Sequence, residues 1–179
     1  MSNTTPVKNP FLLRPEQAQV CEIHCTREQA TLKLWPTPAG VRAAIAEQEG
    51  MANERYVWRH YNCGSLLFCG VGLVMDGGDP LYRDAAAPKY YKDGADGSFL
   101  AAAAMYGFGR GLMESCAFRV PGDRVRIDPE AAPDGKTIRS YKLGEKLHVG
   151  ELAYNEDGSL QRATVCNAAG EEVAVWQQR

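Results

Sequence analysis

The chain has 179 residues, of which 45% are hydrophobic, and a formal net charge of −2 at pH 7. This composition fits one medium-sized folded domain and excludes disordered, collagen-like and membrane-spanning chains. The small negative charge also argues against a protein that coats nucleic acid with its whole surface. Any nucleic-acid site is therefore expected to be local.

Neither the N-terminal segment nor the apolar runs indicate a membrane protein. The start, MSNTTPVKNPFLLRPEQ, has no basic segment followed by an apolar stretch and a cleavage site. The longest apolar run, GSLLFCGVGLVM, is too short and too rich in glycine to cross a bilayer. We therefore expect a cytoplasmic protein without a membrane partner, whose six cysteines stay reduced.

The first third of the chain predicts an arm, two strands and a helix. Residues 1–15 contain three prolines and are predicted to form a flexible arm, with a single α+β domain over residues 16–179. Segments 18–25 and 30–35 are predicted strands. Residues 37–50 predict a helix, because Thr37 suits the N-cap, Pro38 suits the first helical position and Gly50 suits the end.

The middle of the chain predicts two more strands and a second helix. Segment 54–62 alternates Tyr56, Trp58 and His60 with basic and other residues, so one face is aromatic and the other partly basic. Segment 64–76 is the next predicted strand, and GGDPLYRDAAAP has the composition of a turn and loop. A helix is expected from near Asp96, over residues 97 to about 110.

The remaining chain predicts short strands separated by turns such as PGD, PDG and EDGS. The overall prediction is an α+β fold in which an antiparallel β-sheet packs against a long central helix. The expected order is β-β-α-β-β-α-β, with additional C-terminal strands. The segments concerned are 117–120, 123–128, 136–143, 146–154, 160–167 and 171–178.

The stretch LAAAAMYGFGRGLM carries three alternating glycines, but it does not predict a phosphate-binding loop. Such a loop follows a strand and opens a helix, whereas Gly107, Gly109 and Gly111 follow a helical run. Leu112 also occupies the position of the third glycine in a dinucleotide motif. No nucleotide cofactor is therefore expected.

The same stretch resembles the end of the long helix in phage single-strand annealing proteins of the Rad fifty-two superfamily. The aromatic residue, the two glycines and the arginine match at Tyr106, Gly107, Gly109 and Arg110. VRAAIAEQEG, RYVWRHYN and VPGDRVRIDP fall in the order of that family's elements. The resemblance implies an oligomeric ring or filament that binds and anneals single-stranded DNA without ATP, in recombination or repair.

Annealing requires a basic groove that holds phosphates without sequence preference and aromatic residues on which bases stack. The basic positions of the family helix are Leu100, Ala101 and Ala104 here, so the binding charges are expected elsewhere. The candidates are basic or aromatic residues outside that helix, together with the arginine at its end. They are Arg55, Arg59, Arg83, Lys89, Tyr90, Tyr91, Lys92, Arg110 and Lys142.

The cysteines and histidines offer two further kinds of site, a zinc site and a catalytic thiol. CEIHC and HYNC together offer five potential zinc ligands, but on strands Cys21 and Cys25 face away from His24, so no zinc site is predicted. Cys63 with His148 or His60 could form a cysteine nucleophile and its base, yet two residue types without geometry are weak evidence. No catalytic residue is predicted.

Two other functions stay open. The C-terminal strands and AFRVPGDRV also resemble acyl thioesterases and dehydratases of the hot-dog fold, in which a curled sheet surrounds a central helix. Asp93 and Asp96 are the only acidic candidates near the start of that helix. The third possibility is a phage- or effector-associated interaction protein without chemistry.

Overall fold

The computed structural model describes residues 9–89 and 91–178, and within them it shows the expected α+β fold with three antiparallel sheets. The sheets have the strand orders β6-β2-β1-β8-β7, β3-β4-β5 and β11-β10-β9. The helical elements are η1 (Pro15–Gln17), α1 (Pro38–Met51), α2 (Gly94–Ala104) and α3 (Arg110–Glu114). The strands are β1 (Ala18–Cys25), β2 (Gln29–Pro36), β3 (Glu54–Cys63), β4 (Leu66–Met75), β5 (Leu81–Ala86), β6 (Phe118–Pro121), β7 (Ile127–Ala131), β8 (Ile138–Leu143), β9 (His148–Tyr154), β10 (Leu160–Cys166) and β11 (Glu172–Gln177).

Helix α1 begins where its sequence predicts. The Thr37 side chain accepts a hydrogen bond from the Gly40 backbone N–H at 3.0 Å, and Pro38 occupies the first turn. The buried side of the helix carries Val41, Ala44 and Ile45. A threonine N-cap satisfies a backbone donor that has no partner within the helix, which fixes the start of α1.

Replacing Thr37 with alanine is expected to lower the free energy of unfolding by about 1 kcal/mol, because the Gly40 N–H loses its acceptor. Urea denaturation followed by circular dichroism measures this change. Thr37→Ser keeps the hydroxyl and is expected to retain most of the stability. Equal losses in the two variants would show that the hydroxyl does not cap the helix.

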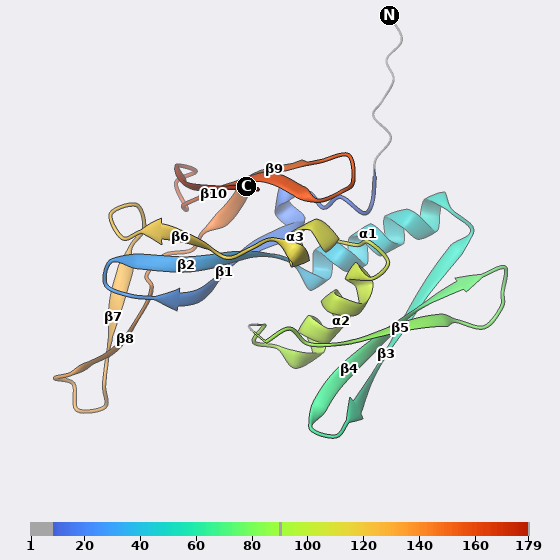
Figure 1. The fold of residues 1–179 in the computed structure, drawn as a ribbon, viewed down its shortest axis with the longest axis horizontal. Helices are drawn as coiled ribbons and strands as arrows, with labels where there is room; N and C mark the ends of the chain where they lie inside the picture. Colours follow the sequence, from blue (N-terminus) through green and yellow to red (C-terminus); the bar gives the residue numbers. More distant parts are fainter. Residues whose placement is uncertain (1–8, 90, 179) are drawn as a thin grey trace, which may run out of the picture.

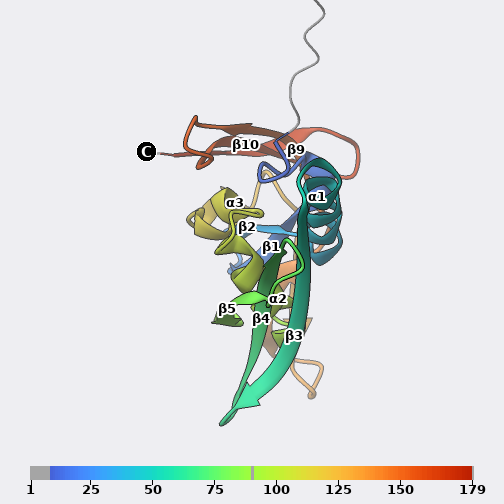
Figure 2. The same ribbon diagram turned by 90° about the vertical axis from the view of Figure 1, so that its right-hand side faces the viewer.

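Helix α2 covers one face of the β3-β4-β5 sheet, and this unit extends away from the rest of the molecule (Figures 1 and 2). Asp93 caps the helix by accepting from the backbone N–H groups of Ala95 and Asp96, both at 2.9 Å. The helix therefore starts two residues before Asp96. Within the helix, Phe99 and Leu100 are fully buried.

The predicted long central helix is wrong, because α2 ends at Ala104 after 11 residues. Gly107 and Gly109 have φ angles of 104° and 67°, which a right-handed helix cannot accommodate. The chain turns over these residues and resumes as the short helix α3. Of the four alanines at residues 101–104, Ala102 and Ala103 are fully buried and the other two are partly buried.

Strand β5 was not predicted, because Leu81–Ala86 lies in a segment with the composition of a loop. It pairs with β4 from Leu73↔Leu81 to Phe68↔Ala86 and completes a three-stranded meander. The observed order between α1 and α2 is thus three strands rather than two. The C-terminal strands β9 to β11 form a sheet of their own, across the top of Figure 1.

Residues 9–15 of the predicted flexible arm pack onto the domain, and residues 1–8 lie outside the described residues. Leu13 is buried, and the Phe11 ring lies 4.9 Å from the Phe108 ring. The Tyr154 hydroxyl donates to the Leu13 carbonyl at 2.9 Å, which ties this segment to β9. Within the described part of the chain, every helix is too short or too polar to cross a bilayer.

Candidate nucleic-acid interface

The two faces of the β3-β4-β5 sheet differ as the alternation of residues in β3 predicts. The Trp58 ring lies 5.3 Å from the Phe99 ring of α2, and the Tyr56 ring lies 5.2 Å from the Phe108 ring. His60 Nε2 is 3.0 Å from the Ala95 carbonyl. These side chains face α2. Arg55, Arg59 and the other alternate residues consequently lie on the opposite face.

We call this opposite face the outer face. It is made of alternate residues of three strands: Arg55, Val57, Arg59, Tyr61, Cys63, Leu66, Phe68, Gly70, Gly72, Val74, Tyr82, Asp84 and Ala86.

Two pairs of flat side chains stack on the outer face. The Arg59 guanidinium lies 4.1 Å from the centre of the Tyr82 ring. Two residues further along β3, Tyr61 pairs with Phe68 of β4. Their rings are nearly parallel, with an angle of 17° between the ring planes and 5.7 Å between the ring centres. Arg59 and Tyr61 are exposed to solvent. An exposed guanidinium plane and an exposed aromatic ring both provide surfaces on which a nucleobase can stack.

Glycines in β4 make room for this arrangement. A Cβ at Gly72 would lie 2.9 Å from the Tyr82 ring, and one at Gly70 would lie 2.4 Å from Asp84 Oδ1. The Tyr82 ring and the Asp84 carboxylate therefore lie directly over the β4 backbone. Larger residues in β4 would lift both side chains off the sheet.

The charge of the outer face comes from Arg55, Arg59 and Asp84. The two arginines are four residues apart on one strand, which corresponds to roughly 13 Å. Asp84 pairs with Gly70, which pairs with Arg59, so the carboxylate lies in the row of Arg59. Partial desolvation first, and then a hydrogen bond to Asp84 and its negative charge, raise the pKa of the Tyr61 phenol. The face has an excess of positive charge although the chain is acidic.

Arg83 lies on the opposite face from Arg59. Its guanidinium donates to the Met105 carbonyl at 3.2 Å and lies 5.0 Å from the centre of the Tyr106 ring. The Met105 carbonyl is at the C-terminal end of α2, where backbone acceptors lack partners in the helix. Arg83 therefore serves as a cap of α2 in this structure.

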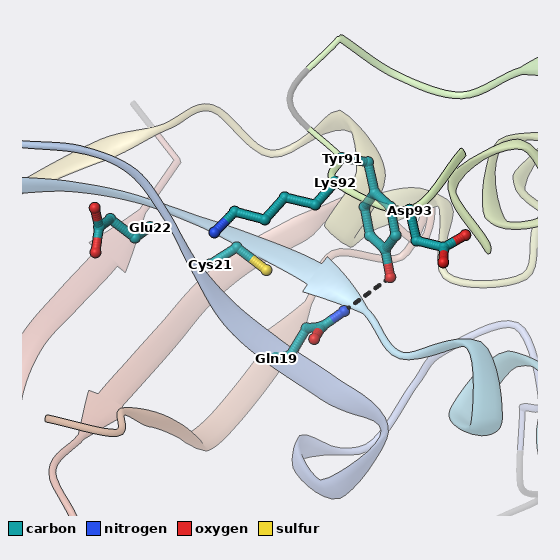
Figure 3. Close-up of a pocket in the computed structure, with 6 residues that line it drawn as sticks. All are labelled: Gln19, Cys21, Glu22, Tyr91, Lys92 and Asp93. Atoms are coloured by element: carbon teal, nitrogen blue, oxygen red, sulfur yellow. Dashed lines mark hydrogen bonds between the residues drawn. The ribbon is translucent and has the colours of Figure 1, made fainter. Parts of the chain in front are cut away.

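Tyr91 and Lys92 line a cavity of about 310 Å³ against β1 (Figure 3). The Gln19 amide donates to the Tyr91 hydroxyl at 3.1 Å, and the Tyr91 ring meets the Trp35 ring edge-on, with 5.5 Å between centres. Lys92 extends toward Cys21 in the same cavity (Figure 3). Burial raises the pKa of the Cys21 thiol, and the Lys92 charge partly offsets this shift.

Arg110 and Lys142 belong neither to the outer face nor to the cavity lined by Tyr91 and Lys92. The Arg110 guanidinium, at the start of α3, pairs with Glu114 at 2.7 Å, and Lys142 pairs with Glu130 at 3.1 Å in the β7-β8 hairpin. That hairpin and the β3-β4-β5 sheet lie at opposite ends of the molecule (Figure 1). Lys89 is exposed, and Tyr90 lies outside the described residues. The predicted residues that the structure describes therefore do not form one continuous groove.

Sequence reasoning found Arg55 and Arg59 but missed their neighbours on the outer face. Tyr61 and Phe68 could have been found, because they alternate correctly within predicted strands. Tyr82 and Asp84 could not, because β5 looked like a loop and its register was unknown. Only the pairing of three strands brings these residues beside Arg59.

The described residues, 9–89 and 91–178, contain no group of three or more histidine, cysteine or acidic side chains that could hold a metal ion. All six cysteines are free thiols. Cys63 ends β3 at one side of the molecule and His148 begins β9 at the other, so these two residues are not brought together (Figures 1 and 2).

No protein-family model, no curated protein and no solved structure matches this chain. These comparisons therefore assign the chain to no family. The resemblance of LAAAAMYGFGRGLM to phage annealing proteins therefore remains a prediction, and the outer face is the feature on which a function can be argued.

Proposed function

We propose that the protein binds single-stranded DNA on the outer face of the β3-β4-β5 sheet and accelerates the pairing of complementary strands without ATP. The observation that carries this proposal is the pair of adjacent stacks, Arg59 on Tyr82 and Tyr61 on Phe68, on an exposed face. Stacking suits any base, and arginine attracts phosphates. Together they bind single strands with little sequence preference.

The order of elements also supports annealing over the hot-dog alternative. A helix, an antiparallel sheet and a second helix follow one another from α1 to α2, in the order that the resemblance implies. A hot-dog enzyme would wrap one curled sheet around its central helix. The described strands instead form three separate sheets.

The proposal includes an oligomer that acts in the cytoplasm during recombination or repair. Among the described strands, β3, β5 and β7 are at the edges of their sheets and present unpaired backbone groups. Such edges can pair with another copy of the chain, and subunits joined head to tail form a ring or filament. Native mass spectrometry with and without single-stranded DNA tests this part.

Replacing Arg55 and Arg59 with glutamine is expected to weaken binding of a labelled (dT)₂₀ oligonucleotide measured by fluorescence anisotropy. Each lost phosphate contact should flatten the slope of log affinity against log salt by about 0.7. Thermal stability should change little, because both side chains are exposed. Arg59→Lys keeps the charge but loses the planar stack, so it should retain the slope and still bind more weakly.

A matched control is the double variant Arg119→Gln and Arg139→Gln, which removes the same charge from exposed positions on β6 and β8. It should bind almost as the wild type does. If the folded wild-type protein fails to bind at micromolar concentration and low salt, the annealing proposal is wrong. If both double variants lose the same affinity, the outer face is not the site.

A further inference from the structure

We infer that Asp84 makes the outer face prefer a guanine at one position of the bound strand. This inference rests on the proposed function and names the base that one part of the site selects. The inference is based on the position of the Asp84 carboxylate between two stacks, Arg59 on Tyr82 and Tyr61 on Phe68. A surface that only bound phosphates would not be expected to carry a negative charge at its centre.

The location of Asp84 follows from strand register. Its carboxylate lies over Gly70, with Oδ1 2.4 Å from where a Cβ would be. On β3, the residue paired with Gly70 is Arg59, and Tyr61 is two residues further along. Asp84 is exposed to solvent. A base stacked on Arg59 or Tyr61 would therefore have one of its edges within reach of this carboxylate.

The chemistry of the carboxylate selects among the bases. An ionised carboxylate only accepts hydrogen bonds, and it binds best to two neighbouring donors. Guanine offers such a pair on its pairing edge, at N1–H and the 2-amino group. On the pairing edges of adenine and cytosine the amino group lies beside an acceptor nitrogen, and in thymine the single N–H lies between two carbonyls.

The same carboxylate also orients the strand. Asp84 repels phosphates, while Arg55 and Arg59 on β3 attract them. The sugar-phosphate backbone is therefore expected to follow β3, with the bases directed toward β5. This orientation points the pairing edge of one base at Asp84 and leaves the other bases free to pair.

The test compares labelled (dT)₁₂ oligonucleotides that carry one central guanine, 7-deazaguanine, inosine, adenine or cytosine. Guanine and 7-deazaguanine should bind roughly fivefold more tightly than the others, because inosine lacks the 2-amino group and 7-deazaguanine keeps both donors. Asp84→Asn replaces one acceptor by a donor. This variant should lose the guanine preference and bind plain (dT)₁₂ slightly more tightly, since a negative charge is removed.

Asp79→Asn is the matched control, because Asp79 is exposed in the turn between β4 and β5 and the change in charge is the same. It should keep the guanine preference. Equal affinity for guanine and inosine in the wild type, or an unchanged preference in Asp84→Asn, would overturn the inference while leaving single-strand binding in place. Failure of every oligonucleotide to bind would instead overturn the proposed function and this inference with it.

Discussion

Phe99→Ala is expected to lower the free energy of unfolding by about 4 kcal/mol. The Phe99 side chain is fully buried between α2 and the sheet. Its ring meets Trp58 of β3 at 5.3 Å, and the Arg42 guanidinium of α1 lies 5.0 Å from its centre. Truncation would leave a cavity where three elements meet, and the surrounding elements can only partly close it. Urea denaturation monitored by tryptophan fluorescence measures the loss.

Met105→Ala is the control for Phe99, because Met105 follows the same helix but is 50% exposed. Its replacement should cost well under 1 kcal/mol. The outer face lies on the far side of the sheet from Phe99. Any Phe99→Ala protein that remains folded should therefore bind (dT)₂₀ nearly as the wild type does. A loss below 1 kcal/mol for Phe99→Ala would mean that α2 is not held on the sheet by this residue.

Gly111→Ala is expected to lower the free energy of unfolding by about 3 kcal/mol. A Cβ at this position would lie 2.6 Å from the Gly158 carbonyl oxygen and 3.0 Å from the Leu160 backbone nitrogen. Both neighbours belong to the backbone, so they cannot move aside as the end of a flexible side chain can. The helix α3 and the turn between β9 and β10 would have to separate. Thermal and urea denaturation both measure this effect.

Gly50→Ala is the control for Gly111→Ala, because it makes the same substitution at a position with free space. Gly50 lies in the last turn of α1, and a Cβ there would meet nothing within 4 Å. Alanine favours the helix over glycine, so this change should raise the free energy of unfolding by roughly 0.5 kcal/mol. Similar losses for the two variants would contradict the packing described around Gly111.

Local signals in the sequence were sufficient for α1 and for the two faces of β3. Thr37 and Pro38 define the start of α1 through interactions within one turn. The alternation of Tyr56 and Trp58 with Arg55 and Arg59 identifies the aromatic and basic sides of β3. Both predictions depend on residues close together in the chain, for which sequence patterns are informative.

Long-range features were not predictable in the same way. In strand β5, Tyr82 and Asp84 fit over Gly72 and Gly70 of β4, and no local pattern in LYRDAA indicates this fit. The end of α2 was misplaced because the glycines after it were assigned to the end of a longer helix. Arg110, which was expected at the end of that helix, instead begins α3. The division of the strands into three sheets depends on tertiary pairing alone.

The β3-β4-β5 meander and α2 are formed by one uninterrupted stretch, Glu54 to Ala104. Contacts between residues close in sequence form quickly, so this stretch is suited to fold early and to open as one cooperative unit. Amide hydrogen exchange should therefore be slowest in β4, which has a hydrogen-bonded neighbour on each side, and faster at the outer edge of β3. Bound DNA should slow exchange across the whole stretch together, even at amides on the side of α2 that no nucleotide touches.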